Sequence, residues 1–347
     1  MKNYQIKLSP VSPFSGFPSS DTLFGAICWG IKRIYNETKL ATILENYQEK
    51  PEFILSSSFP YIECNNDIFF FPKPTSPGLS ASDIYEMAKI KKEKVEIITK
   101  YKKFKKSEYF SFALFSRFLN NVSEKILFQE YLNDEVKLKG KLLMSKKELE
   151  GFNFVEKEPL LKSELVQKNA IDRLTMSTGE EGQTFYQEEY FASPAFKLHF
   201  LIKTDNIESF KPIFRYLEDK GIGGNRSVGK GRFKIETLNT ISVGNDTACN
   251  FITLSRYIPD IAEINPESKS MFYAIFPYRS KVDSEAEFKG EDIWKSKVIY
   301  LKEGSCFEAK ERKPFYGQCP VVKEIGGQKI RQYGFAFPVF GNIGGSK

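Results

Sequence analysis

A glycine-rich, cationic segment, "GIGGNRSVGKGRF" from Gly221 to Phe233, has the residue types and spacing that could bind a phosphorylated ligand. It contains Arg226, Lys230 and Arg232, no acidic residue, and five glycines: Gly221, Gly223, Gly224, Gly229 and Gly231. Glycines let backbone N–H groups approach a phosphate directly, and successive N–H groups can form anion-binding nests. The arginines add forked donors, so the segment suits a phosphodiester backbone running across it.

Two other interpretations of the segment need to be weighed. The stretch from Gly224 to Gly231 comes close to the Walker A pattern GxxxxGK[ST], but Gly231 stands where the magnesium-binding hydroxyl should be. The segment also follows an expected helix and enters an expected strand, which is the reverse of a phosphate-binding P-loop. We therefore do not expect NTP hydrolysis here. A plain structural turn stays open, because glycine is what a reversing backbone uses, although one or two would suffice.

The elements around the glycine segment have the order of a ferredoxin-like domain. Alternating residues predict strands at Tyr4–Pro10 and Phe196–Lys203, and a third at Arg232–Leu238. Helical spacing predicts a helix from Thr22 to about Tyr35, which Ser20 or Asp21 could cap, and another at about Ser209–Lys220. Gly25 and Gly30 inside the first helix indicate close packing against a sheet. The succession β-α-β…β-α-β is typical of ferredoxin-like folds.

Two insertions and a second domain complete the expected organisation. Residues 82–132 look mostly helical, "NAIDRLTMSTGEEGQTFYQEEYF" (Asn169–Phe191) has two halves around a turn and predicts a hairpin, and short strands restart near residue 245. We therefore predict an α+β chain. Its first domain, residues 1–240, is ferredoxin-like (RRM-like), with a helical insertion at about 82–132 and a hairpin at about 165–195. A smaller β-rich domain, residues 245–347, could be a degenerate second copy.

The charge is concentrated in the helical insertion. Nine lysines and two glutamates between Lys89 and Lys106 give +7, which equals the net charge of the whole chain. A localised positive field indicates a polyanionic partner. A solvated lysine-rich helix is the alternative.

Several protein classes do not fit the composition. The five cysteines are widely spaced without a CxxC pair, so neither a zinc site nor a disulfide framework is indicated. No apolar run approaches the roughly 20 residues that span a bilayer, and the N-terminus does not read as a signal peptide. We expect a cytoplasmic protein with reduced thiols, no cofactor, no metal and no membrane partner.

The segments taken together resemble a known family. A helix, "GIGGNRSVGKGRF" and the last strand of a ferredoxin-like unit resemble the RAMP superfamily of CRISPR-associated proteins. The opening "SGFPSSDTLFGAICWGI", the middle "NAIDRLTMSTGEEGQTFYQEEYF" and the closing "YGFAFP" look like the Csm subunit four family. The resemblance spans both ends and the middle of the chain. It implies a non-catalytic subunit of a type III-A CRISPR (Csm) complex, which takes part in antiviral defence.

The resemblance also implies partners and contact residues. The family binds the 5′ handle of the guide RNA (crRNA) and docks beside the large polymerase-like subunit and the backbone RAMP subunits. The glycine segment would contact the sugar-phosphate chain, and the hairpin would act as a thumb that displaces a base. The RNA-contacting residues implied in this way are Phe17, Ser19, Ser20, Asp172, Arg173, Phe185, Tyr186, Tyr190, Gly221, Gly223, Gly224, Asn225, Arg226, Ser227, Gly229, Lys230, Gly231 and Arg232. Helix capping explains Ser19 and Ser20 almost as well, and ordinary hairpin core is the alternative for Phe185, Tyr186 and Tyr190.

Some RAMP relatives instead cut precursor guide RNA, often with a histidine. The one histidine, His199, lies in the expected strand Phe196–Lys203, on the face opposite Phe196, Leu198, Phe200 and Ile202. We expect that face to be the more polar one, with neighbouring lysines disfavouring the protonated ring. We predict a structural or RNA-contacting role for His199 and no catalytic residue. An endoribonuclease acting on precursor crRNA is the alternative function.

Overall fold

Four antiparallel strands form the centre of this computed structural model, which describes residues 1–87, 91–150, 159–169, 171, 175–178, 184–245, 248–283 and 292–343. β1 (Lys2–Pro10) lies between β10 (Phe196–Thr204) and β11 (Phe233–Thr240), and β3 (Phe59–Ile62) pairs with the other edge of β10. The order β11-β1-β10-β3 is that of a ferredoxin-like βαββαβ unit. The α+β class is therefore confirmed.

Helices α1 (Ser20–Ile34) and α7 (Lys211–Lys220) occupy the two crossover positions of this unit and pack on each other. Of the isoleucines and leucine whose helical spacing predicted α1, Leu23, Ile27 and Ile31 are buried, whereas Ile34 is 41% exposed. The predicted start of this helix was wrong: it begins at Ser20, and Ser19 takes the N-cap position. The short stretch before α7 forms a 3₁₀ turn, so that helix begins two residues later than predicted.

Gly30 of α1 packs against a helix, not against a sheet as we expected. A Cβ atom there would lie 2.5 Å from Cγ2 of the α7 residue Ile213. At Gly25 a Cβ atom would meet nothing within 4 Å, so close packing does not explain that glycine. Of the two glycines, only Gly30 is needed for the close approach of α1 to α7.

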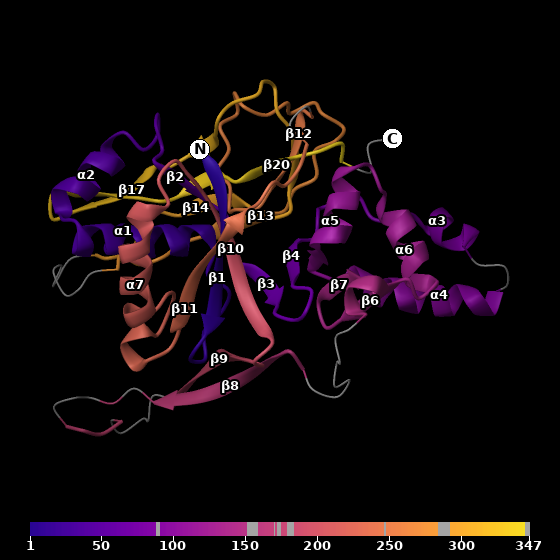
Figure 1. The fold of residues 1–347 in the computed structure, drawn as a ribbon, viewed down its shortest axis with the longest axis horizontal. Coiled ribbons are helices and arrows are strands. Elements are labelled where there is room, and N and C mark those ends of the chain that lie inside the picture. Colours follow the sequence, from indigo (N-terminus) through magenta and orange to yellow (C-terminus); the bar gives the residue numbers. More distant parts are fainter. Residues whose placement is uncertain are drawn as a thin grey trace.

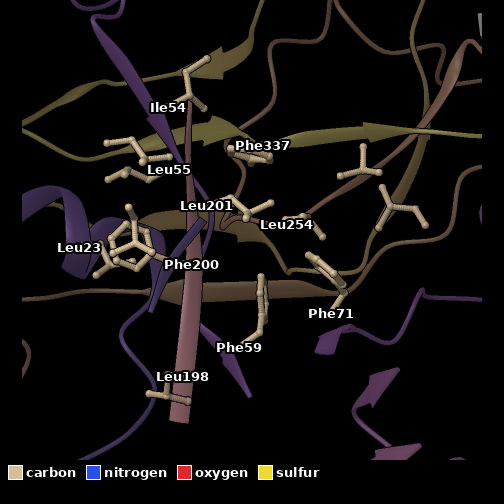
Figure 2. Packing of buried hydrophobic residues seen from close by; sticks show 14 of the residues in the cluster. Leu23, Ile54, Leu55, Phe59, Phe71, Leu198, Phe200, Leu201, Leu254 and Phe337 are labelled. Atoms are coloured by element: carbon tan, nitrogen blue, oxygen red, sulfur yellow. The ribbon is translucent and has the colours of Figure 1, made fainter. Parts of the chain in front are cut away.

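The C-terminal part of the chain covers the second face of β10. Figure 2 shows Leu201 of β10 beside Leu254 and Phe337, while Leu23 lies beside Phe200. All these side chains belong to one buried cluster, and Leu201 is 0% exposed. Both faces of β10 are buried, which explains the nearly continuous burial of its residues.

The helical insertion extends the sheet before and after its helices (Figure 1). Before the insertion, the short helix α2 (Glu37–Glu45) is followed by β2 (Phe53–Leu55), which pairs with β10. The elements of the insertion and of the strands on either side of it are β4 (Ile68–Pro72), α3 (Ala81–Glu86), α4 (Lys91–Lys105), β5 (Tyr109–Ser111), α5 (Phe112–Leu119), α6 (Glu124–Leu132), β6 (Val136–Lys139) and β7 (Leu142–Ser145). The expectation of a mostly helical region is confirmed.

The C-terminal region is made of short strands. They are β12 (Asn250–Thr253), β13 (Ile275–Tyr278), β14 (Val298–Leu301), β15 (Cys306–Glu308), β16 (Tyr316–Gln318), β17 (Val321–Ile325), β18 (Gln328–Arg331), β19 (Gly334–Ala336) and β20 (Pro338–Phe340). Part of this region has its own buried cluster around Phe251, Tyr257 and Tyr316, and part joins the main core. The division into two domains stays a prediction.

The predicted hairpin is present, but its first arm lies earlier in the sequence than expected. β8 (Leu161–Asn169) pairs with β9 (Thr184–Ala192) from Leu161↔Ala192 to Asn169↔Thr184. The first arm therefore ends where we expected it to begin. Asp172 and Arg173 lie outside the described residues. The hairpin projects from the sheet next to the turn between α7 and β11 (Figure 1).

Replacing Gly30 with alanine should destabilise the fold, whereas Gly25→Ala should not. Alanine gains about 1 kcal/mol over glycine inside a helix. At position 30 the added methyl group must displace buried Ile213, and overpacking of this kind costs about 1–3 kcal/mol. Urea unfolding midpoints of the two variants should therefore move in opposite directions. Equal stabilisation by both variants would contradict the packing described here.

Candidate nucleic-acid interface

Three segments that are far apart in the sequence meet beside β1. They are the first loop (residues 11–19), the base of β9, and the glycine loop (residues 221–232). Val11 N–H donates to the Arg232 carbonyl at 2.9 Å, and Gly231 N–H donates to the Pro13 carbonyl at 2.9 Å. Phe14 exchanges two backbone hydrogen bonds with Tyr190, at 2.8 and 3.2 Å. The structure thus brings together the three regions from which we predicted RNA contacts.

The glycine loop is closed at its base by backbone contacts. Ile222 N–H donates to the Gly231 carbonyl at 2.8 Å, and a Cβ atom at position 231 would lie 2.3 Å from the Ile222 carbonyl oxygen. Gly221, Gly223, Gly229 and Gly231 all have positive φ angles, as does Asn225 at 61°. Gly224 has neither a positive φ angle nor a crowded Cβ position.

The amides at the tip of the loop are not used by the fold. Within the described ranges, the N–H groups of Gly223, Gly224, Asn225, Arg226 and Ser227 have no protein acceptor. The following amides, from Val228 to Gly231, all donate to carbonyls of the loop or of Pro13. Consecutive unused N–H groups on a partly exposed turn have the chemistry of an anion-binding nest.

Two of the loop cations are paired with acidic residues from elsewhere. Arg226 pairs with Asp283, and Lys230 contacts buried Glu189 at 2.8 Å. Lys168 of β8 contacts the same carboxylate at 2.8 Å, and hydrogen bonds from Lys168 and then Lys230 hold the pKa of Glu189 below its usual value. Arg232 is exposed and has no ion-pair partner in the described part of the chain.

The aromatic residues of the hairpin have two different environments. Phe185 is 49% and Tyr186 is 65% exposed, so neither is part of a core. Tyr190 stacks on buried Phe14, with ring centroids 5.8 Å apart, and also contacts Phe17 at 6.2 Å. Tyr190 therefore anchors the base of the hairpin to the first loop, whereas the two outer rings are available for stacking.

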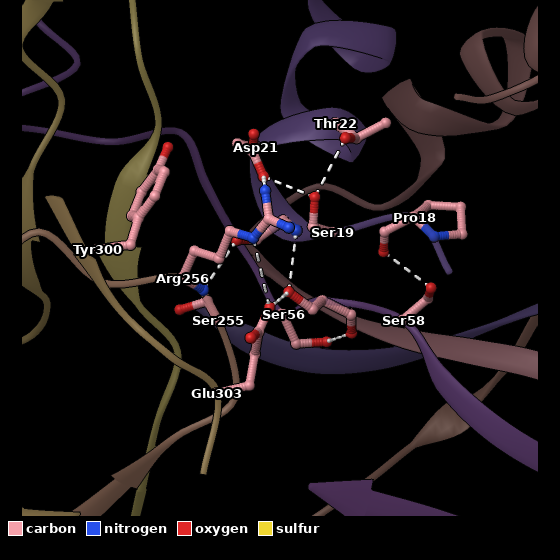
Figure 3. Close-up of polar contacts among 12 residues, drawn as sticks. Pro18, Ser19, Asp21, Thr22, Ser56, Ser58, Ser255, Arg256, Tyr300 and Glu303 are labelled. Atoms are coloured by element: carbon pink, nitrogen blue, oxygen red, sulfur yellow. Dashed lines mark hydrogen bonds and ion pairs between the residues drawn. The ribbon is translucent and has the colours of Figure 1, made fainter. Parts of the chain in front are cut away.

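The end of the first loop is buried and held by Arg256, a residue that the sequence did not single out. Ser19 is 8% and Ser20 is 0% exposed. Figure 3 shows the Arg256 guanidinium beside Asp21 at the start of α1, at 3.0 Å. The same guanidinium lies 4.8 Å from the ring centroid of Phe276 and 5.0 Å from that of Tyr278. The sequence around Arg256 contains no motif that predicts its contact with the start of α1.

Comparisons with known proteins identify relatives by sequence and by fold. No protein-family model matches the sequence. The CRISPR system Cms protein Csm4 of Methanocaldococcus jannaschii is 28% identical over 239 residues, which cover 63% of this chain and 59% of that protein. The protein of the same name from Thermococcus onnurineus is 25% identical over 258 residues, which cover 73% and 74%. The match thus spans less than two thirds of the first relative.

Solved structures match over nearly the whole chain. A chain in the crystal structure of the Csm3-Csm4 subcomplex has a TM-score of 0.65 and 20% identity, covering 98% of this chain and 99% of its own. A chain in the Csm1-Csm4 cassette with pppApA has a TM-score of 0.55 and 17% identity, covering 99% of both. The chain is similar to curated Csm4 proteins in sequence and to a solved Csm3-Csm4 subcomplex chain in fold. The predicted resemblance is therefore confirmed.

The single histidine of the chain is inaccessible to solvent. His199 is 0% exposed, and its Nε2 lies 2.8 Å from the Phe70 carbonyl, which can only accept. Nε2 therefore carries the proton, and Nδ1 accepts from the Gln5 amide at 3.1 Å. We were wrong to expect a polar face and a charge effect there. Burial is the main cause that lowers the pKa of His199, to about 4.

Metal ligands, thiols, apolar helices and a second cavity give no further candidate site among the described residues. Within these ranges, no group of three or more His, Cys, Asp or Glu side chains could hold a metal ion. All five cysteines have free thiols. Among the helices of the described residues, none is long and apolar enough to cross a membrane. A cavity of about 630 Å³ against the outer side of α7, lined by Lys211, Arg215 and Asp219, contains none of the predicted site residues.

Gly231→Ala should disrupt the glycine loop far more than Gly229→Ala. Both glycines have positive φ, which costs a non-glycine residue roughly 1–2 kcal/mol. Only at position 231 would the new Cβ also collide with backbone, at the Ile222 carbonyl. Urea unfolding should show a clearly larger loss of stability for the alanine at 231. Similar losses for the two variants would mean that the loop is not closed in this way.

His199 should not titrate near neutral pH. Its imidazole proton NMR signals, which are unambiguous because the chain has one histidine, should stay unchanged from pH 8 to 5.5. The unfolded chain takes up a proton near pH 6.5 that the folded chain takes up only near pH 4. Stability should therefore fall as pH drops through that window, by about 1.4 kcal/mol per pH unit. This dependence should be absent in His199→Gln. A midpoint near 6.5 in the folded protein would show that solvent reaches the ring.

Proposed function

We propose that this chain is a non-catalytic RNA-binding and assembly subunit of a type III-A CRISPR (Csm) complex, which binds the 5′ handle of the guide RNA. Similarity to two curated Csm4 proteins supports a subunit role. The observation that carries the RNA-binding part is the row of unused amides from Gly223 to Ser227, in the same loop as exposed Arg232. Such donors fit successive phosphates of a single strand.

The arrangement of the exposed side chains supports the same function. Phe185 and Tyr186 project from the hairpin whose base contacts the glycine loop through Glu189 and Lys230. Base–aromatic stacking contributes about 1–3 kcal/mol per base, and single-stranded RNA is recognised through splayed bases. Contacts of RNA with Phe17, Ser19 and Ser20 also belong to the proposal, but Phe17 is half-buried and the two serines are buried. These are less accessible than the glycine loop.

The proposed partners follow from the relatives. The similar structures are the Csm3-Csm4 subcomplex of a type III-A interference complex and a Csm1-Csm4 cassette. By analogy, this chain docks beside the large polymerase-like subunit and the backbone RAMP subunits. The absence of catalysis is part of the proposal, and it is supported by His199, whose two ring nitrogens are both bonded inside the core.

The proposal is tested on the assembled particle. The chain is purified with its neighbouring subunits, the bound RNA is extracted, and its 5′ end is mapped for protection. We expect the handle to be protected in the wild type and less so in Arg232→Glu. A handle that is fully accessible in the wild-type particle would refute the proposal.

Loss of loop cations should reduce the salt dependence of binding. With the guide RNA extracted from the particle, Arg232→Ala should lower the magnitude of the slope of log K against log salt by about 0.7, the value of one phosphate contact on a single strand. Arg226→Ala with Lys230→Ala should lower it by up to about 0.7 per lost contact, less where Asp283 and Glu189 already neutralise the cations.

The matched control for this measurement is Lys211→Ala with Arg215→Ala. Both residues are exposed on the first turns of α7, away from the glycine loop, so the slope should stay that of the wild type. If the loop variants leave the slope unchanged as well, these side chains do not meet phosphate.

A further inference from the structure

A cavity of about 670 Å³ lies where the first loop, the helical insertion and the C-terminal strands meet. Phe17 and Ser19 of the first loop line it, as do Tyr109 of β5, Phe276 of β13 and Glu303 after β14. Figure 3 shows the polar wall of this region, with Ser19, Ser58, Arg256 and Glu303. Its volume is within the 300–1,000 Å³ of small-molecule pockets.

The cavity has two cations without anionic partners. Lys105, at the end of α4, and Lys302, after β14, both line it and are both exposed. Neither forms an ion pair with any described residue. By contrast, Lys73 in the same wall contacts Glu124 at 3.1 Å, and Arg256 contacts Asp21. Two unpaired ammonium groups beside one cavity attract a phosphate.

The same cavity offers ring surfaces and an unused acceptor. Phe17, Tyr109 and Phe276 are partly exposed, and the Lys302 ammonium lies 5.6 Å from the Phe276 ring centroid. Oε1 of Glu303 accepts a hydrogen bond from the Ser57 hydroxyl and lies 3.9 Å from Arg256 Nε, whereas Oε2 has no partner among the described residues. A carboxylate oxygen accepts from an exocyclic amino group of a base. The combination of rings, acceptor and ammonium groups matches a nucleotide.

The cavity is adjacent to the candidate interface. The Phe17 ring contacts Tyr190 at the base of the hairpin, with centroids 6.2 Å apart, and Tyr109 in the cavity at 6.0 Å. An RNA strand that crosses the glycine loop and the base of the hairpin would therefore reach the cavity, because only the Phe17 ring lies between Tyr190 and Tyr109.

We infer that this cavity is a pocket for one unstacked nucleotide of the bound strand, with its base against Phe276 and its phosphate on Lys105 and Lys302. The inference rests on the proposed function. The Glu303 carboxylate favours a base that carries an exocyclic amino group, so adenine, cytosine or guanine is accepted over uracil.

The test uses the assembled particle with guide RNA in which single handle positions carry 4-thiouridine or 6-thioguanosine. After irradiation, crosslinked peptides are identified by mass spectrometry. We expect one position to crosslink to peptides containing Phe276 or Tyr109, more strongly with 6-thioguanosine. Other positions should crosslink to the glycine loop. The cavity crosslink should be lost in Lys105→Glu with Lys302→Glu and retained in Lys102→Glu with Lys103→Glu, whose exposed lysines lie on the same helix but do not line the cavity.

The outcomes separate the two proposals. Crosslinks to the glycine loop without any to the cavity overturn the pocket and leave the proposed function standing. Crosslinks to neither overturn both. Equal crosslinking by both thionucleosides overturns the base preference.

Discussion

The close approach of backbone at the base of the glycine loop is the constraint on which the candidate interface depends. The Ile222 amide donates to the Gly231 carbonyl, and no Cβ atom fits between the two segments at position 231. Because the base is closed, the residues between must turn back within a short span, which requires left-handed backbone at several positions. The same closure presents Gly231 N–H to Pro13, and so fixes the first loop beside the glycine loop.

A second tie holds the opposite end of the first loop. Arg256 belongs to the C-terminal part of the chain, yet it pairs with Asp21 at the start of α1 and donates its backbone N–H to Ser20. The same part of the chain buries Leu201 on the second face of β10. The C-terminal strands therefore complete the core and position the first loop, so they are not an appendage to the ferredoxin-like unit.

The sequence predicted the elements that have a regular pattern. Alternation and helical spacing found β1, β10, β11, α1 and α7 and their order, because each has one face in the core. It could not predict long-range partners. Whether Lys230 is free depends on Glu189, forty-one residues away. The surroundings of His199 depend on Phe59 of β3 and on Phe69 and Phe71 of β4, more than a hundred residues earlier in the chain. Alternation also misled at β10, because a strand covered on both faces keeps polar residues that find partners inside.

Gly224, the remaining glycine of the loop, is informative because no contact or backbone angle in the described chain requires a glycine there. Gly221 and Gly231 close the base, and Gly223 and Gly229 have left-handed backbone. Gly224 has neither property, since a Cβ atom there would meet only Ser15 Oγ at 3.8 Å, an ordinary contact. A side chain at this exposed position would project from the turn whose amides have no acceptor in the described chain. The absence of a side chain is explained if another molecule approaches that backbone closely, and a plain structural turn has no need of it.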